Sequence, residues 1–280
     1  MNPVTLPDAE WFDLAAPGGG ASWRIFLARP AGVAPAAGFP VVYMLDANTG
    51  FATFAEVLRR GAVRPSATGI APAVLVGIGY RAGEDARARR SFDYTAGPGA
   101  EAGDRLCGGR DAFLAFIEQV LKPRIAREVR VDPARQMLFG HSLAGWFALD
   151  VMARDSDAFR SYVAVSPSIW WDAARLAAGL DRARRAPPRL SVLVGEWEQA
   201  LSPWQSARPE AGEMAARRAR RAMVDRARDF TERARAAFGP DAQVRFDLLA
   251  GEDHASILPA AMARALRFAF ADAPEQSAAT

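Results

Sequence analysis

The apolar residues of the chain occur either in short continuous runs or at helical spacing, and the two patterns alternate along the sequence. Residues 41–45 form a continuous run between Pro40 and Asp46, which is typical of a strand buried on both faces. Strands that alternate with helices favour a largely parallel sheet. Strands are predicted at residues 11–15, 23–28, 41–45, 73–78, 137–139, 161–165, 190–194 and 244–249, and helices at residues 51–60, 111–129, 146–151, 213–238 and 258–270. The pattern therefore predicts an α/β fold with a mostly parallel central sheet of about eight strands flanked by helices.

The first two predicted strands are separated by Pro-Gly-Gly-Gly at residues 17–20, which indicates a β-hairpin. Asp111 is the expected cap of the helix at residues 111–129, which is interrupted only by Pro123. Residues 80–110 are rich in Gly and Arg and show little periodicity. A loop of that length in a compact domain is usually functional, so we expect it to form a wall of the substrate site.

Composition limits the classes of protein to consider. With 280 residues, half of them apolar, the chain can form one domain over residues 1–280, with its core at about 10–270 and a disordered tail at 272–280. The single cysteine, Cys107, excludes an internal disulfide and a cysteine-built metal site. All basic residues except Lys122 are arginines, but they alternate with acids, which argues against a nucleic-acid partner.

No apolar run reaches membrane-spanning length, and the first residues lack both a basic segment and an apolar core. The sequence therefore predicts a cytoplasmic protein without a membrane partner, or a periplasmic one if a leader has been removed. It does not indicate an oligomeric state.

The segment around Ser142 has the pattern of a nucleophile elbow, in which a serine stands on a sharp turn between a strand and a helix. The turn needs small neighbours because the serine backbone is strained there. Gly140 stands two residues before the serine, whereas Ala144 occupies the second position where glycine is usual, followed by Gly145. Alanine is small enough for the strand and helix to approach, so Ser142 is the predicted nucleophile.

A serine hydroxyl requires a base to remove its proton, and the chain has two histidines. His141 is adjacent to Ser142, and adjacent side chains diverge in a strand. His254 follows the last predicted strand, where a hydrolase with the chain order serine, acid, histidine places its base. We therefore expect His254 to be the base.

The histidine needs a carboxylate to orient its ring, and that acid is expected after the preceding strand. Glu198 and Glu196 both stand there; Glu198 is the preferred acid, Glu196 is the alternative, and a serine–histidine pair without an acid stays open. Two backbone N–H groups are needed for the oxyanion. Leu143, directly after the serine, and Ala47, in the loop after the strand at residues 41–45, are the expected donors.

Six strings of the sequence together resemble the esterase-D-like family of α/β-hydrolases, over about residues 10–270. Within it they are most similar to siderophore trilactone esterases acting on enterobactin, salmochelin and bacillibactin. The strings are Tyr43-Met-Leu-Asp-Ala-Asn48, Val76-Gly-Ile-Gly-Tyr80, Arg89-Arg-Ser-Phe-Asp-Tyr-Thr95, Phe139-Gly-His-Ser-Leu-Ala-Gly145, Ser166-Pro-Ser-Ile-Trp-Trp171 and Gly251-Glu-Asp-His254. The resemblance implies the α/β-hydrolase fold, no metal or organic cofactor, and ester hydrolysis through an acyl-enzyme with Ser142 and His254.

The same resemblance implies a small-molecule ester substrate, in particular an anionic ferric siderophore. Arg90, Arg89, Trp170 and Trp171 stand in the family-like strings and are the expected substrate-binding residues. For both arginines, a salt bridge to Asp93 or another nearby acid is an equal alternative. A general carboxylesterase, a feruloyl-type or S-formylglutathione-type hydrolase, an acyl transferase, and an inactive binding protein on this fold are the alternative functions.

Overall fold

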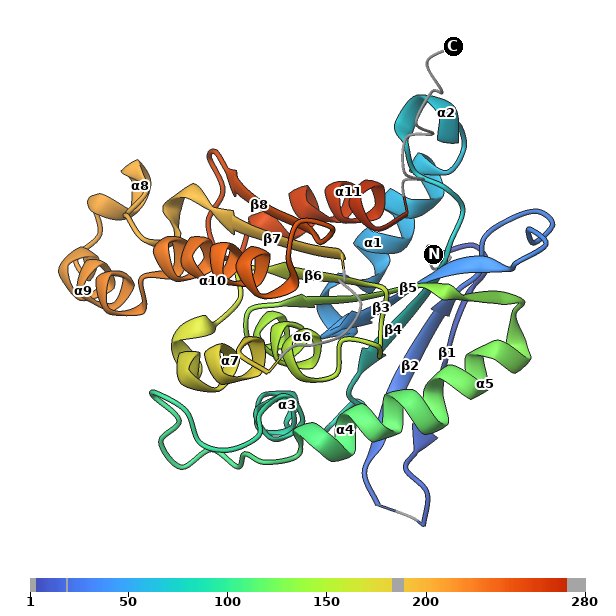
Figure 1. The fold of residues 1–280 in the computed structure, drawn as a ribbon, viewed down its shortest axis with the longest axis horizontal. Coiled ribbons are helices and arrows are strands. Elements are labelled where there is room, and N and C mark those ends of the chain that lie inside the picture. The colour runs from blue at the N-terminus through green and yellow to red at the C-terminus, as the bar shows by residue number, and fades with distance from the viewer. Residues whose placement is uncertain (1–3, 19, 183–188, 271–280) are drawn as a thin grey trace.

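The computed structural model describes residues 4–18, 20–182 and 189–270, and the predicted disordered tail lies outside this range. The described chain contains one eight-stranded sheet with the order β1-β2-β4-β3-β5-β6-β7-β8 (Figure 1). The strands are β1 (Ala9–Ala15), β2 (Ser22–Ala28), β3 (Phe39–Leu45), β4 (Val74–Gly79), β5 (Val131–His141), β6 (Ser161–Val165), β7 (Arg189–Gly195) and β8 (Gln243–Leu249). The pairs β1·β2 and β2·β4 are antiparallel and the other pairs are parallel, so both the predicted hairpin and the parallel sheet are confirmed.

Helices cover both faces of the sheet (Figure 1). One face packs against α1 (Ala47–Gly61) and α11 (Ile257–Phe270), through sheet residues such as Val42 and Met44. The other face presents Tyr43 and Leu45, the alternate positions of the same strand, to a second apolar cluster. That cluster includes residues of α4 (Arg110–Phe116), α6 (Leu143–Arg154), α7 (Ala173–Leu180) and α10 (Met223–Phe238). A strand buried on both faces explains the continuous apolar run at residues 41–45.

The remaining helical segments are short or peripheral. They are α2 (Pro65–Thr68), α3 (Ala86–Tyr94), η1 (Ile117–Leu121), α5 (Lys122–Glu128), η2 (Ile169–Trp171), η3 (Glu196–Glu198), α8 (Pro203–Ser206) and α9 (Ala211–Arg221). Among the described helices, none is both long enough and apolar enough to span a membrane.

The helix predicted at residues 111–129 continues through Pro123 because the turn before the proline is a wider, π-helical turn. The π-helical segment η1 lies immediately before α5, and the N–H of Lys122 bonds the carbonyl of Ile117. Proline has no N–H and its ring clashes with the carbonyl four residues earlier, so a wider turn lets the chain continue. The expectation that Asp111 caps this helix is wrong, because Gly109 occupies the N-cap and Asp111 stands in the first turn.

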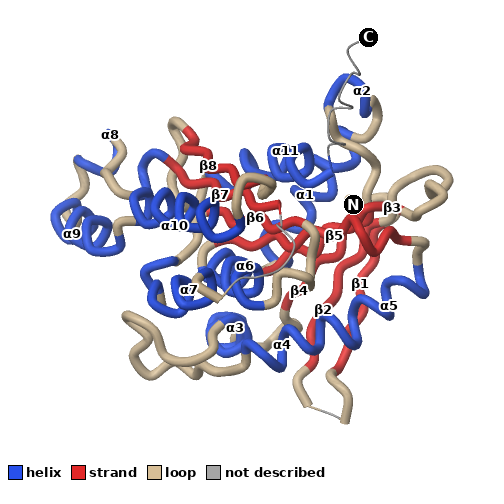
Figure 2. Tube along the Cα trace, in the orientation of Figure 1, coloured by secondary structure: helices blue, strands red, loops and turns tan. Residues whose placement is uncertain are grey.

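Two other expectations about secondary structure are wrong. The stretch 80–110 is not all loop, since it contains α3, whose first turn is capped by the Asp85 carboxylate accepting from the Ala88 N–H at 3.0 Å (Figure 2). The predicted helix 213–238 is divided into α9 and α10 at Ala222, which has a left-handed backbone with φ 42°. None of the residues of α9 is buried, whereas α10 buries a face including Phe230. The change of direction lets α10 pack while α9 stays on the surface.

Candidate active site

Ser142 occupies a strained turn between β5 and α6. Its φ is 60° and its ψ is −119°, a conformation that a side chain makes costly. A Cβ at Gly140 would lie 2.2 Å from the carbonyl oxygen of Ala144, so the strand and helix can meet only with glycine there. The Ser142 N–H donates to the Val165 carbonyl at 2.9 Å, and its own carbonyl accepts from the Ser168 N–H at 3.0 Å. The end of β6 and the segment that follows it therefore support the strained turn.

The structure brings Ser142, His254 and Glu198 into one hydrogen-bonded line. The Ser142 Oγ lies 3.1 Å from His254 Nε2, and His254 Nδ1 lies 2.7 Å from Glu198 Oε2. These residues follow β5, β8 and β7, whose carboxyl ends meet at one edge of the parallel sheet. The arrangement can transfer a proton from the serine to the histidine, which makes the serine a nucleophile.

The Glu198 carboxylate is buried, with 3% of the residue exposed, and is held by more than the histidine. Its Oε1 accepts from the Gly195 N–H at 2.8 Å and from the Ser166 hydroxyl at 2.5 Å. A buried charge needs such donors to offset the loss of water. The sequence did not assign Ser166 a role, although it begins one of the family-like strings.

Glu196 does not contact His254 but fastens the turn before it, since its Oε2 accepts from the Gly251 N–H at 2.8 Å. The end of β7 also touches this turn directly. The Trp197 N–H donates to the Glu252 carbonyl at 2.9 Å, and a Cβ on Gly195 would lie 2.5 Å from that same oxygen. The acid-bearing turn and the histidine-bearing loop are therefore in close backbone contact.

His141 contacts the main chain of His254. Its Nε2 lies 2.8 Å from the His254 carbonyl oxygen, and the two ring centroids are 4.7 Å apart. Burial, followed by the nearby His254, lowers the pKa of His141 from its ordinary 6.5 to about 4. The ring is therefore neutral over the usual range of pH.

The two expected oxyanion donors, Leu143 and Ala47, are the first residues of α6 and α1. The first N–H groups of a helix have no partner within the helix, so both are available to a ligand in this respect. Asp46 precedes Ala47 in a left-handed conformation with φ 54°, and its own N–H donates to the Tyr94 hydroxyl at 3.3 Å. Because Asp46 is fixed in this way, the direction in which α1 begins is fixed too.

A cavity of about 360 Å³ lies beside Ser142, and Arg90 is the predicted substrate-binding residue that reaches it. The Arg90 guanidinium forms a two-point pair with Asp46, with Nε to Oδ1 at 3.1 Å and Nη2 to Oδ2 at 2.7 Å. The Tyr94 hydroxyl donates to the same carboxylate at 2.9 Å. The residues lining the cavity are Met44, Leu45, Asp46, Asn48, Thr49, Tyr80, Ala86, Arg87, Arg90, Phe139, His141, Ser142 and Leu258.

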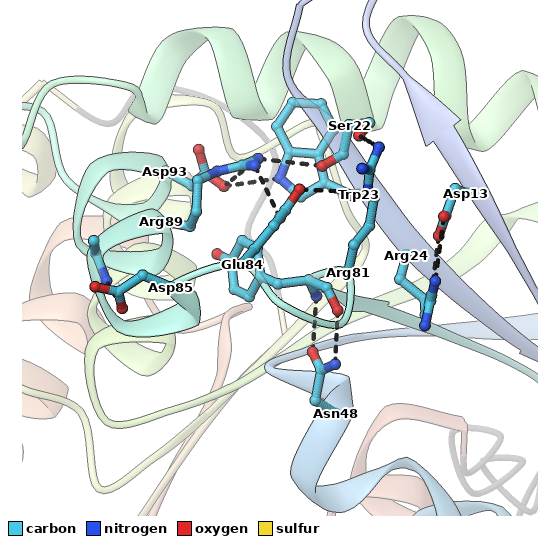
Figure 3. A network of polar contacts seen from close by, with 12 residues as sticks. Asp13, Ser22, Trp23, Arg24, Asn48, Arg81, Glu84, Asp85, Arg89 and Asp93 are labelled. Atoms are coloured by element: carbon cyan, nitrogen blue, oxygen red, sulfur yellow. Dashed lines mark hydrogen bonds and ion pairs between the residues drawn. The ribbon is translucent and has the colours of Figure 1, made fainter.

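Arg89 does not line this cavity, and Figure 3 shows it within a polar network near the β-hairpin. It pairs with Glu84 at 3.1 Å and with Asp93 at 3.7 Å, and it donates to the Ser22 carbonyl at 3.2 Å. The alternative of a salt bridge therefore describes Arg89, through Glu84 and Asp93, and it also describes Arg90, through Asp46. In the same view, the Asn48 amide bonds both the N–H and the carbonyl of Tyr80 at 2.8 Å, which ties α1 to the end of β4.

The structure places neither Trp170 nor Trp171 on the wall of this cavity. Trp171 is only 2% exposed, and its carbonyl accepts from the Ala100 N–H at 2.7 Å, so it supports the loop after α3. Trp170 is half-buried, with the Arg221 guanidinium 4.1 Å from its ring centroid. The expectation of substrate contact is not met for Trp171, because its side chain belongs to the core.

Across the described ranges of the chain, no group of three or more His, Cys, Asp or Glu side chains is arranged to hold a metal ion. A second cavity, of about 330 Å³, is lined by the segment before β1, the end of β2, α1 and the residues just before β4, and neither Ser142 nor His254 lines it. The serine, histidine and glutamate at the sheet edge are thus the group with an evident chemical use.

Comparison with known proteins gives consistent matches. The family model described as "Putative esterase" matches residues 20–236. The ferri-bacillibactin esterase BesA of Bacillus subtilis is 34% identical over 96% of this chain and 91% of its own length. A siderophore triacetylfusarinine C esterase of Aspergillus fumigatus is 33% identical over 97% of this chain and 96% of its own. The siderophore hydrolase EstB of Aspergillus nidulans superposes with a TM-score of 0.84 at 27% identity, covering 98% of each chain.

Proposed function

The chain belongs to the "Putative esterase" family, and we propose that, as a carboxylic-ester hydrolase of that family, it cleaves the ester bonds of a ferric siderophore. Ser142 would be the nucleophile, His254 the base and Glu198 the orienting acid. The observation that carries the mechanism is the continuous line of hydrogen bonds from Glu198 through His254 to Ser142. The substrate class is inferred from relatives that are named siderophore esterases and match nearly the whole chain.

In the first half of the reaction, His254 Nε2 takes the Ser142 proton as the Oγ attacks the ester carbonyl. The imidazolium that forms is stabilised by Glu198, whose carboxylate is already fixed by two further donors. His254 then gives the proton to the departing alcohol, which leaves an acyl group on Ser142. In the second half, the same histidine activates water, and hydrolysis of the acyl-enzyme restores the serine.

The oxyanion of each tetrahedral intermediate would accept from the N–H groups of Leu143 and Ala47. Both groups start helices, whose N-terminal ends carry partial positive charge. Such donors act because they are in place before charge develops, so no reorganisation is needed during the reaction.

For an anionic substrate, two arginines, Arg87 and Arg90, line the cavity beside the nucleophile, and Arg90 is the one that the sequence predicted to bind substrate. Asp46 engages Nε and Nη2, and Nη1 makes no hydrogen bond to any residue that the structure describes. One guanidinium can therefore hold Asp46 and still donate to a negatively charged oxygen of a catecholate or hydroxamate group. We assign substrate contact to Arg90 and not to Arg89, whose donors face Glu84 and Ser22.

The decisive experiment compares kcat/KM of the purified chain on a ferric trilactone siderophore, the iron-free trilactone and p-nitrophenyl butyrate. We expect the ferric siderophore to be the best substrate and the neutral ester to be turned over slowly. A marked preference for the neutral ester would instead support a general carboxylesterase. The absence of all three activities from folded protein would contradict the hydrolase mechanism.

A further inference from the structure

We propose that His141 is a positioning residue for this reaction: its ring holds the backbone carbonyl of His254 and thereby sets the distance between the general base and Ser142. The inference rests on the proposed function, because it gives His254 the role of base. It assigns His141 no contact with the substrate.

The geometry of the contact fixes the chemistry of the ring. His141 Nε2 lies 2.8 Å from the His254 carbonyl oxygen. A carbonyl can only accept a hydrogen bond, so Nε2 must carry the proton and donate it. His141 is the last residue of β5 and is covalently joined to Ser142. The same end of β5 therefore leads into the nucleophile Ser142 and, through His141, holds the loop that carries the base His254.

His254 needs such a contact because its own ring is already fully used. One ring nitrogen faces Ser142 and the other faces Glu198, and the side chain is 46% exposed. Those bonds orient the imidazole but do not hold the backbone from which it extends. The residues flanking His254 are fastened elsewhere. Gly251 is bound by Glu196, and the Asp253 carboxylate accepts from the N–H groups of Ala255 and Ser256 in the turn before α11. The bond from His141 holds the middle of the loop.

The charge state of His141 suits this position. During the reaction His254 becomes an imidazolium, and a second positive ring 4.7 Å away would oppose that step. Burial and the proximity of His254 lower the pKa of His141 to about 4, although the hydrogen bond to the His254 carbonyl, and then Glu198 and Asp46, act in the opposite direction. His141 therefore stays neutral when His254 is protonated, and it can hold the base without repelling it.

Two amide variants form a matched test. In His141→Gln the amide nitrogen stands at about the reach of Nε2, whereas in His141→Asn it stands at about the reach of Nδ1 and cannot contact the carbonyl. With p-nitrophenyl butyrate as substrate, we expect kcat to fall on the order of ten- to a hundredfold in His141→Asn, with KM changed by less than about twofold. We expect His141→Gln to retain kcat within about threefold, because its amide N–H can replace the Nε2–H donor to the His254 carbonyl.

Kinetics should be accompanied by active-site titration with a fluorophosphonate, so that kcat refers to folded protein alone. A second readout is the far-downfield proton resonance of the His254–Glu198 hydrogen bond. We expect it to persist in the wild type and in His141→Gln, and to broaden or move in His141→Asn. Equal kcat and equal spectra in the two variants would overturn the proposal, as would a loss of thermal stability with unchanged kcat.

The neutral ester separates this proposal from the choice of siderophore as substrate, because it tests only the chemistry at Ser142. If the wild type turned over the neutral ester but no siderophore, the proposed substrate would fail and the test of His141 would stand. If the wild type hydrolysed no ester, the proposed function would fail, and the proton resonance would still decide whether His141 positions His254.

Discussion

Two regions of the molecule use polar residues in opposite ways. One is the edge of the sheet that carries Ser142, His254 and Glu198, here called the nucleophile edge, and the other is the stretch at residues 80–110. At the sheet edge, hydrogen bonds from several elements converge on His254 and Ser142, and Ser142 lines the cavity. In the stretch at residues 80–110, several charged groups satisfy one another, as Arg89 does with Glu84 and Asp93. The difference teaches that a cation near a site is available to a ligand only to the extent that nearby carboxylates leave its donors free.

The largest expected effect is at the nucleophile edge. Ser142→Ala and His254→Ala should each reduce kcat/KM for every ester by at least about 10⁴-fold, because they remove the nucleophile or its base. Thermal unfolding should be nearly unchanged, since neither side chain is part of the core clusters. Steady-state assays of both variants measure this, and undiminished turnover by pure Ser142→Ala protein would show that another residue attacks the ester.

The two glutamates of the same region should differ strongly. Glu198→Gln should lower kcat on the order of 10³-fold, because an amide cannot stabilise the imidazolium of His254 as a carboxylate does. Glu196→Gln is the matched control, with an expected loss of less than about tenfold, since its partner is the Gly251 N–H. Parallel measurement of kcat decides the ranking. A greater loss of kcat in Glu196→Gln would identify Glu196 as the orienting acid. No loss in either variant would favour a Ser142–His254 pair that works without an acid.

Acid sensitivity is the next largest expected difference, and it should arise at the nucleophile edge. The folded-state pKa of His141 is lowered from 6.5 to about 4, so the unfolded chain binds more protons between these values. Stability from this group is therefore complete above pH 6.5 and is lost as the pH falls toward 4, by at most about 3 kcal/mol. The free energy of unfolding, measured with urea at several pH values, should fall less steeply with decreasing pH in His141→Gln than in the wild type. Identical slopes would mean that His141 titrates normally in the folded protein.

Substrate preference should show a smaller effect on replacement of Arg90, one of the two arginines that line the cavity. Arg90→Ala should lower kcat/KM for the ferric trilactone about ten- to a hundredfold, mostly through KM, because a charge-assisted contact contributes roughly 1.5–3 kcal/mol. The neutral p-nitrophenyl ester should lose less, and only through the released Asp46. Arg89→Ala is the control and should leave the ratio of the two substrates unchanged. Added salt should reduce the wild-type preference as well. Equal damage to both substrates in Arg90→Ala would make Arg90 purely structural.

The sequence predicted the sheet and the sharp turn at Ser142 because the signals for both are local. The strand, the small residues and the helix around Ser142 are contiguous. Chain order and the exclusion of His141 indicated His254, and chain order left Glu198 and Glu196 as the candidate acids. The division at Ala222 has no such signal, since alanine is a good helix former and the turn is imposed by packing of α10. The helix α3 was hidden because its charged residues gave no apolar period.

The supporting contacts of the site could not be predicted because they join residues that are distant in sequence. Ser166 meets Glu198 32 residues later, and His141 meets His254 across 113 positions. Nothing in the composition around Arg90 shows that Asp46, 44 residues away, engages it. The sequence supplies the types of residue that can pair, whereas only the register of strands and the docking of loops decide which pairs form.

The close approach of Gly195 to the backbone of Glu252 marks a position of this enzyme where no other residue fits. The smallest side chain at that position would press against the Glu252 carbonyl and push the histidine loop outward, although residue 195 itself performs no chemistry. Neighbouring backbone cannot give way as a flexible side chain can, so even alanine should be poorly tolerated. An effort to redesign specificity therefore has to keep the meeting point of the β7 and β8 loops as it is.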